Sequence, residues 1–262
     1  MPRADLVDAI GRLDDLTRRL RVECPWDREQ DERTIVPHTV EEAYELADAA
    51  QCGDDAKLLD ELGDVLFQVH FLALLLEERG AGDLGQVAEH IRQKLIRRHP
   101  HVFGGAEAET AGEVLRNWDQ IKAGEPGRER GLFAEVPENL PAPLYARKVQ
   151  RRAGSSGFDP LGAEEALEAV RAGADEADRA AGDRDASFEA VGDLLFAAVN
   201  AARKLRVDPE LALRSSSDRF RARLEAAAAL ARAGGAEWAD LEPGRQLELY
   251  AEARLNEPPG RP

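Results

Sequence analysis

The sequence predicts an all-α protein, and three observations support this fold class. Ala, Leu, Glu and Arg, which favour helix, dominate the 262 residues, whereas aromatic residues make up only 5%. Runs of alternating β-branched residues, which would indicate strands, do not occur in the sequence. Hydrophobic residues recur instead at the 3.6-residue spacing of amphipathic helices. At 43% of the chain, the hydrophobic residues suffice to bury a core.

The first two helices follow from this spacing. One helix spans about residues 5–21 and ends before the segment CPWDREQ at residues 24–30, which we expect to be a loop or turn because of its proline. Thr39 is a candidate N-cap for a second helix, and Gly53 supplies its C-terminal stop.

Three more helices complete the first half. A long apolar stripe over residues 55–78 predicts a buried helix at the centre of the unit. A fourth helix runs over about residues 83–99 and ends before a proline. Thr110 and Glu113 have the spacing of a capping box and predict the start of a fifth helix.

The second half of the chain repeats the first. The motif GDVLFQVHFLA at residues 63–73 matches GDLLFAAVNAA at residues 192–202, with an offset of 129 residues. A segment rich in Gly and Pro, residues 124–143, is the expected linker. We therefore predict a first repeat at residues 1–123 and a second at residues 144–262.

Composition excludes several classes of protein. A formal net charge of -16 opposes binding to nucleic acid. The most apolar window, residues 65–76, is too short to cross a membrane, and the first residues do not resemble a signal peptide. Cys24 and Cys52 cannot form a disulfide scaffold, which favours a reducing compartment. We expect a cytoplasmic protein that binds neither membrane nor nucleic acid.

Two pairs of acidic residues form a candidate metal site. Glu42 and Glu45 are three residues apart on one predicted helix, and Glu61 and Asp64 are three apart on the next, so each pair shares a helix face beside the apolar stripe. Four such acids would repel one another unless a hard divalent cation such as Mg²⁺ neutralised them. The alternative is that they are solvated, or that Glu42 closes a capping box with Thr39.

Cations and an aromatic residue could contact a phosphorylated substrate. Lys94, Arg97 and Arg98 lie at positions i, i+3 and i+4 of the fourth predicted helix and could bind phosphates. They could equally complement the dipole at the helix C-terminus. Lys57 lies one turn before Glu61 and could pair with it or with a phosphate. Large aromatic residues such as Trp118 could stack on a base, but they are more often core residues.

Five motifs together resemble the MazG family of nucleoside triphosphate pyrophosphohydrolases. They are CPWD at residues 24–27, EEAYE at 41–45, ELGDVLFQ at 61–68, KLIRRHPHVF at 94–103 and NWDQIK at 117–122. The segment LYARKVQRRAGSSGFDP at residues 144–160 is similar to the opening of the family's second repeat. The resemblance covers nearly the whole chain.

This resemblance implies tandem helical repeats that form units of the four-helix-bundle type and assemble as a homodimer. It implies hydrolysis of nucleoside triphosphates to the monophosphate and pyrophosphate, with Mg²⁺, or Mn²⁺ in its place, as cofactor. It assigns the metal ligands to Glu42, Glu45, Glu61 and Asp64, with Glu41 as a nearby catalytic acid. The substrate-binding residues that it implies are Lys94, Arg97, Arg98 and Trp118, to which we add Lys57 because of its spacing from Glu61.

The second repeat departs from the family pattern. Alignment of its helices puts Ala172 and Gly173 where the paired acids belong and Ala190 in place of the first acid of the next helix. Glu176 and Asp193 remain. We therefore expect the first repeat to be the active one and the second to be a scaffold.

The expected reaction is attack of water on the α-phosphorus, with Glu41 or Glu45 as the proton acceptor. One alternative is a helical dimer without activity that binds nucleotides or serves as a scaffold. Another is a narrow-specificity enzyme of the all-α dUTPase or dCTPase type, or a phosphoribosyl-ATP pyrophosphohydrolase. The motifs CPWD and RRHPHVF favour hydrolysis of nucleoside triphosphates over both alternatives.

Overall fold

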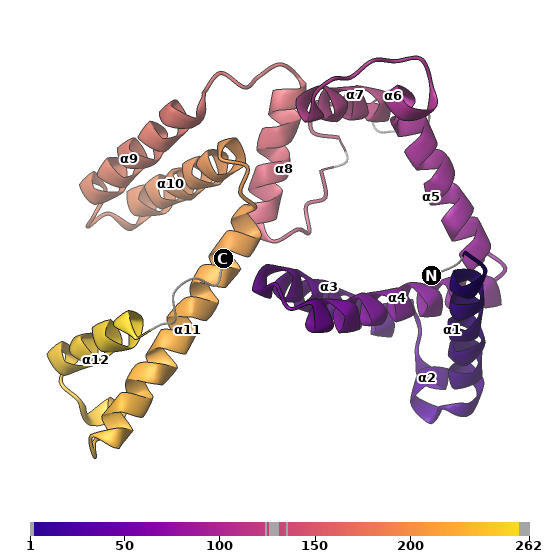
Figure 1. Ribbon diagram of the computed structural model, residues 1–262. Coiled ribbons are helices and arrows are strands. Elements are labelled where there is room, and N and C mark those ends of the chain that lie inside the picture. The colour runs from indigo at the N-terminus through magenta and orange to yellow at the C-terminus, as the bar shows by residue number, and fades with distance from the viewer. Residues whose placement is uncertain (1–2, 124, 126–130, 135, 257–262) are drawn as a thin grey trace. The chain divides into compact units, whose positions relative to one another are not determined.

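The computed structural model describes residues 3–123, 125, 131–134 and 136–256, without the side chains of residues 111, 115, 116, 119, 120 and 123. Within these ranges the regular structure consists of helices, with no strand, which confirms the predicted all-α class (Figure 1). No helix among the described residues is long and apolar enough to cross a membrane.

The chain divides into two compact units between Ala108 and Glu109. Helix α7 (Ala111–Ala123), which the sequence assigned to the end of the first repeat, belongs to the second unit and contacts α8 (Ala142–Ser155). The proposed linker at residues 124–143 lies partly outside the described residues. We call residues 1–108 unit 1 and residues 109–259 unit 2.

Unit 1 is built around a hairpin of two long helices. Helix α3 packs along α4, and α4 also contacts α1 and α5 (Figure 1). Ile35, Phe71 and Leu75 form the buried core where α3 meets α4. The helices of unit 1 are α1 (Arg3–Glu23), α2 (Pro25–Glu29), α3 (Glu32–Cys52), α4 (Asp55–Glu78), α5 (Leu84–Arg98) and α6 (Pro100–Phe103).

Two local predictions for unit 1 were wrong. The segment after Cys24 forms the short helix α2, because a proline in the first helical turn has no amide hydrogen to leave unpaired. Helix α3 begins seven residues before Thr39, since Asp31 and Thr34 make a complete capping box. The Thr39 hydroxyl instead donates to the carbonyl of Ile35 within the helix.

Unit 2 contains a second hairpin, α9 against α10, and a helical pair, α11 against α12. Small residues on α11 and α12, together with Leu249, form its buried core. The predicted capping box at the start of α7 is confirmed, since Thr110 and Glu113 exchange backbone-to-side-chain hydrogen bonds. The remaining helices are α9 (Ala163–Arg179), α10 (Arg184–Lys204), α11 (Pro209–Ala233), the 3-10 helix η1 (Trp238–Asp240) and α12 (Pro243–Leu255).

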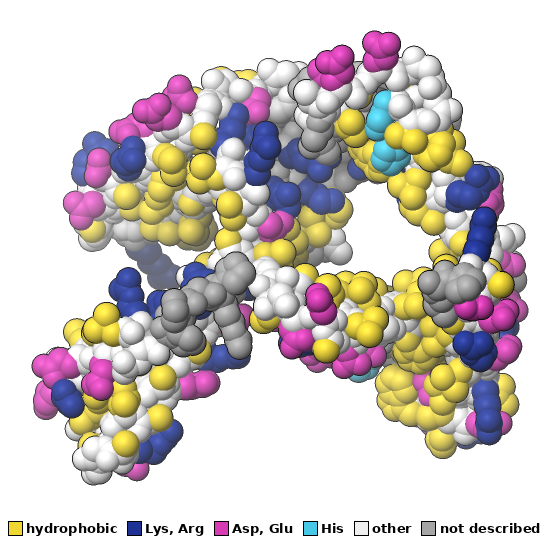
Figure 2. All heavy atoms as spheres, in the orientation of Figure 1, with side chains coloured by type: hydrophobic (Ala, Val, Ile, Leu, Met, Phe, Trp, Pro, Cys, Tyr) yellow, Lys and Arg dark blue, Asp and Glu magenta, His cyan; other side chains and the backbone are white. Residues whose placement is uncertain are grey.

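Both hairpins leave hydrophobic side chains on the surface, as Figure 2 shows over α9 and α10. In unit 1 the exposed set on α3 and α4 comprises Val36, Val40, Leu59, Leu62, Leu66 and Val69. In unit 2 the exposed set on α9 and α10 comprises Leu167, Phe188, Val191, Leu195 and Phe196. Apolar surface of this extent on a hairpin is typical of an interface.

Candidate metal centre

A tight turn between α3 and α4 brings the acidic residues of unit 1 together. Gly53 ends α3 with φ 66°, a left-handed conformation that favours glycine, and the Asp54 carboxylate then caps α4 by accepting from the amides of Ala56 and Lys57. Glu45 lies eight residues before Gly53 and Glu61 eight residues after it. The two helices therefore meet with these acids at the same level.

Glu42, Glu45 and Glu61 form the predicted cluster. One carboxylate oxygen from each lies within 4.8 Å of the others. Glu61 is buried, with 8% of its surface exposed, whereas Glu42 is half-buried and Glu45 is exposed. The cluster therefore reaches from the interior of the hairpin to its surface.

The electrostatics of the cluster are unfavourable for three ionised carboxylates. Burial, followed by the charges of Asp64, Glu45, Glu61 and Glu41, raises the pKa of Glu42 above its usual value. Burial and the charge of Glu45 raise the pKa of Glu61 in the same way. A cation in the centre would reverse both effects.

The fit to a hard divalent cation is good. Two oxygens bound to one Mg²⁺ at about 2.1 Å are at most about 4.2 Å apart, so the three oxygens, which lie within 4.8 Å of one another, need to move only slightly closer together. All three donors are carboxylates, the ligand type that Mg²⁺ and Mn²⁺ prefer. The residues present can therefore hold such an ion with small side-chain adjustments.

Three other predicted residues lie around the cluster. Asp64 is exposed, outside the group of three, but its charge acts on both Glu42 and Glu61. Lys57 is exposed and lowers the pKa of Glu61. Glu41 is exposed on α3 and lies next to Glu42 in the sequence. The structure thus brings the fourth acid and one cation to the edge of the cluster.

Sequence reasoning missed a histidine beside this cluster. His38 lies one turn before Glu42 on α3, and its Nδ1 is 3.7 Å from the Glu41 carboxylate. Its ring contacts Trp26 of α2 edge-on, with the ring centres 5.7 Å apart. Trp26 is half exposed, so the pair offers aromatic surface near the acids. The (i, i+4) spacing from His38 to Glu42 was the available signal.

The predicted basic residues lie on another helix. Lys94, Arg97 and Arg98 occupy the last turns of α5, whereas the acids lie on α3 and α4. Lys94 is half-buried, Arg97 is exposed and Arg98 is buried. Their contact with phosphates stays a prediction. Trp118 lies on α7 in unit 2, where it lines a pocket.

The corresponding hairpin of unit 2 has no equivalent cluster among its described residues. Gly173, aligned with Glu42, lies so close to α10 that an added Cβ would be 3.2 Å from the Cα of Leu194. Ala190, aligned with Glu61, is buried with 7% of its surface exposed. Glu176 and Asp193 are both exposed.

The chain is similar in sequence to known proteins. Residues 30–103, which include the acidic cluster, match the MazG nucleotide pyrophosphohydrolase domain. A nucleoside triphosphate pyrophosphohydrolase of Escherichia coli is 37% identical over 96% of this chain and 99% of its own length. The nucleoside triphosphate pyrophosphohydrolase/pyrophosphatase MazG of Thermotoga maritima is 40% identical over 75% of this chain and 76% of its own length.

A solved structure of a mazG-related protein from Thermotoga maritima is 26% identical, covers 43% of this chain and 97% of its own, and superposes with a TM-score of 0.38. The match to the Escherichia coli protein extends over nearly the full length of both chains. The acidic cluster of unit 1 falls inside the matching domain. The chain therefore belongs to the MazG family.

Proposed function

We propose that the chain hydrolyses nucleoside triphosphates to the monophosphate and pyrophosphate at the acidic cluster of unit 1. The observation that carries this proposal is the group of three carboxylates contributed by two helices, with oxygens within 4.8 Å of one another. The family model covers this part of the chain, and the full-length relatives bear the name of this activity.

Glu42, Glu45 and Glu61, with Asp64 beside them, would hold Mg²⁺ or Mn²⁺. The ion would supply Lewis acidity, stabilising charge on the phosphate oxygens. The half-buried and buried positions of Glu42 and Glu61 fix the inner side of the site, while the exposed Glu45 and Asp64 face the substrate. The carboxylates must be ionised to bind the ion, so the bound state depends on pH.

The remaining residues of the cluster would handle the proton and the substrate. Glu41 or Glu45, both exposed, would accept the proton of the water that attacks the α-phosphorus. Lys57, whose charge reaches Glu61, would contact a phosphate at the edge of the site. We keep Lys94, Arg97 and Arg98 as further phosphate contacts, whereas Trp118, which lies on α7 of unit 2, is not assigned to this site.

We also propose that the protein acts as a homodimer in the cytoplasm. The apolar residues that α3, α4, α9 and α10 leave exposed support this assembly, because a second copy would cover them. Each hairpin would then contribute to a four-helix arrangement across the interface.

Product analysis tests the proposed activity. The full chain is incubated with a panel of ribonucleoside and deoxyribonucleoside triphosphates, with and without Mg²⁺, and the products are separated by ion-exchange chromatography. Monophosphate and pyrophosphate that form only with the metal support the proposal. Diphosphate and orthophosphate, or no turnover of any substrate, would contradict it.

A further inference from the structure

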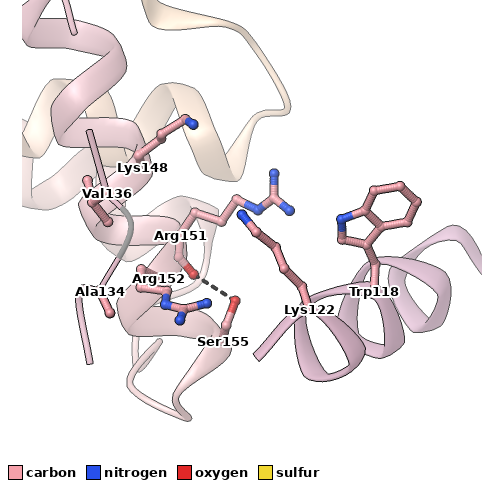
Figure 3. A pocket seen from close by; sticks show the side chains of 8 residues that line it. All are labelled: Trp118, Lys122, Ala134, Val136, Lys148, Arg151, Arg152 and Ser155. Carbon is pink, nitrogen blue, oxygen red and sulfur yellow. Dashed lines mark hydrogen bonds between the residues drawn. The ribbon is translucent and has the colours of Figure 1, made fainter. Parts of the chain in front are cut away.

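A pocket in unit 2 combines positive charge with an aromatic ring (Figure 3). Its volume is about 180 Å³, and α7, α8 and residues 134 and 136 between these helices line it. The lining residues are Trp118, Lys122, Ala134, Val136, Lys148, Arg151, Arg152 and Ser155. Four of these eight described residues are cations and none of the eight is acidic.

Helix α8 presents the cations of this pocket on one face. Lys148, Arg151, Arg152 and Ser155 follow one another at helical spacing i, i+3, i+4 and i+7. Figure 3 shows Lys122 of α7 extending toward Arg151. Three cations of one helix and one of its neighbour therefore surround the same space.

The other side of α8 attaches the helix to the rest of unit 2. Arg147 forms an ion pair with Asp208, and the Gln150 amide donates to the carbonyl of Phe196 at 2.8 Å. The Arg152 Nε donates to the carbonyl of Leu132 at 3.1 Å and so ties the intervening segment to the pocket wall. The pocket is thus built on a helix that other contacts hold in place.

The charge of the pocket is opposite to that of the chain. The protein has 51 acidic and 35 basic residues, yet the described residues that line the pocket include no carboxylate. Like charges at (i, i+3) and (i, i+4) destabilise a helix, and an anion between them would remove that repulsion. Several of these side chains make other contacts as well, which an anion would supplement or displace. The arrangement favours a ligand with more than one negative charge.

The ring of Trp118 indicates which kind of anion the pocket would bind. It lies to one side of the cations, on the same helix as Lys122 and one turn before it (Figure 3). A pocket of this size is smaller than the roughly 300–1,000 Å³ that enclose a whole drug-sized ligand. It can take a chain of phosphates, while a planar base would remain outside the cations and stack on the indole.

We propose that this pocket is a nucleotide-binding site, which takes the phosphates of a nucleoside di- or triphosphate on Lys148, Arg151 and Arg152 and its base against Trp118. The site lies within unit 2, whose hairpin lacks the acidic cluster among its described residues. Binding of nucleotide at this pocket does not depend on hydrolysis by unit 1. Unit 2 would then bind nucleotide without cleaving it.

Binding is measured by fluorescence anisotropy with N-methylanthraniloyl-ADP and the full chain in EDTA. Without metal, the carboxylates of unit 1 repel phosphates, so the signal reports the pocket. We expect saturable binding that weakens at least about tenfold in the double variant Lys148→Ala/Arg151→Ala, because two charge-assisted contacts are lost. Inorganic pyrophosphate should displace the probe and adenosine should not.

The matched control is Arg171→Ala/Arg179→Ala, which removes the same charge from exposed positions on α9. It should change the dissociation constant by less than about twofold. Equal losses in both double variants would show a net-charge effect and overturn the proposal, as would absence of saturable binding to the unsubstituted chain. Tighter displacement by an acidic peptide than by pyrophosphate would also overturn it.

Two further measurements distinguish the possible reasons for weaker binding of the probe. Melting temperatures of both double variants exclude unfolding, and Arg151→Lys, which keeps the charge, should restore part of the affinity lost in Arg151→Ala. Hydrolysis by the same preparation with Mg²⁺ reports the acidic cluster separately. Binding without turnover would contradict only the proposed function, and turnover without binding in EDTA would contradict only this inference.

Discussion

Glu61 and Ala190 are buried to the same degree, 8% and 7% exposed, and each stands two residues before the Gly-Asp pair of the matching motifs in α4 and α10. A carboxylate at such a position is costly unless it is paired or bound to a metal, whereas a methyl group is not. The burial thus has opposite consequences in the two units. Unit 1 has an electrostatically unfavourable acid at this position, and unit 2 has a buried methyl group at the matching one.

Glu61→Gln should reduce the rate of triphosphate hydrolysis at least about 100-fold, because the amide cannot replace a carboxylate ligand. Asp193→Asn in unit 2 should leave the rate within about twofold of the unsubstituted chain. Steady-state pyrophosphate release measures both rates. The reverse pattern, with the Asp193 variant inactive and the Glu61 variant active, would place the reaction in unit 2.

Mg²⁺ should stabilise the chain through the same acids. A ligand at 100 times its dissociation constant adds about 2.7 kcal/mol to the free energy of unfolding of the state that binds it. We therefore expect Mg²⁺ to raise the melting temperature of the chain and to have little effect on the double variant Glu42→Gln/Glu61→Gln. Differential scanning fluorimetry with EDTA and with excess Mg²⁺ measures both shifts; equal shifts would contradict the assignment.

The pH dependence of this shift has a definite sign. The folded-state pKa values of Glu42 and Glu61 are raised above 4.5, so the folded metal-free chain binds more protons than the unfolded chain. Its stability should fall as the pH rises from about 4.5 through these raised values. Protons compete with the ion over the same range. The melting shift caused by Mg²⁺ should therefore be larger at pH 8 than at pH 5, and an equal shift would argue against these ligands.

An ion pair in unit 2 should contribute stability that depends on pH in the opposite direction. Hydrogen bonds from Arg203 and Lys204 lower the pKa of Asp159 to about 2, from an ordinary 3.8. This lowering stabilises the folded chain above the ordinary value and is lost as the pH falls from about 4 to 2. Asp159→Asn should cost about 1 kcal/mol at pH 7 after allowance for its partial exposure, and almost nothing at pH 2.

Urea denaturation monitored by circular dichroism measures this difference. Glu168→Gln serves as the control, since Glu168 pairs with Arg171 at positions where both side chains are mostly exposed. It should change the free energy of unfolding by less than about 0.5 kcal/mol. A cost for Asp159→Asn that is independent of pH would show that charge does not explain it.

Assembly can be tested at the exposed apolar residues. Leu59→Glu and Phe188→Glu place a charge at positions that are 74% and 82% exposed in one chain. Such a substitution should be tolerated by a single chain and should weaken a dimer that buries the position. Light scattering coupled to size-exclusion chromatography should show a dimer for the unsubstituted chain and a larger monomer fraction for the variants. A monomeric unsubstituted chain would refute the proposed assembly.

The helices were predictable from the sequence wherever periodicity and caps agreed. The stripe over residues 55–78 gave α4 with the observed bounds, and Thr110 with Glu113 gave the start of α7. The beginning of α3 was missed because Asp31 with Thr34 makes the same type of cap as the one assigned to Thr39. When two candidate N-caps precede the same helix, the sequence alone does not show which one begins it, because the choice depends on how the helix packs.

The acidic site was predictable because both of its pairs lie near one tight turn. Spacing of three residues fixes a helix face, and Gly53 fixes how the two faces meet. The burial of each acidic side chain was not predictable, since Glu61 is buried whereas Asp64 is exposed on the same helix. The pocket in unit 2 was also missed as a site, because it combines side chains from α7 and α8 that no local pattern connects.

The close approach of Gly173 to Leu194 bears on what it would take to build a metal site in unit 2. An acid introduced at Gly173 alone would press its Cβ against the facing backbone, and an acid introduced at Ala190 alone would be buried without its partners. Each of these substitutions alone is therefore expected to destabilise unit 2. A metal site in unit 2 would therefore require several acids to be introduced together, with a shift of the backbone where α9 faces α10.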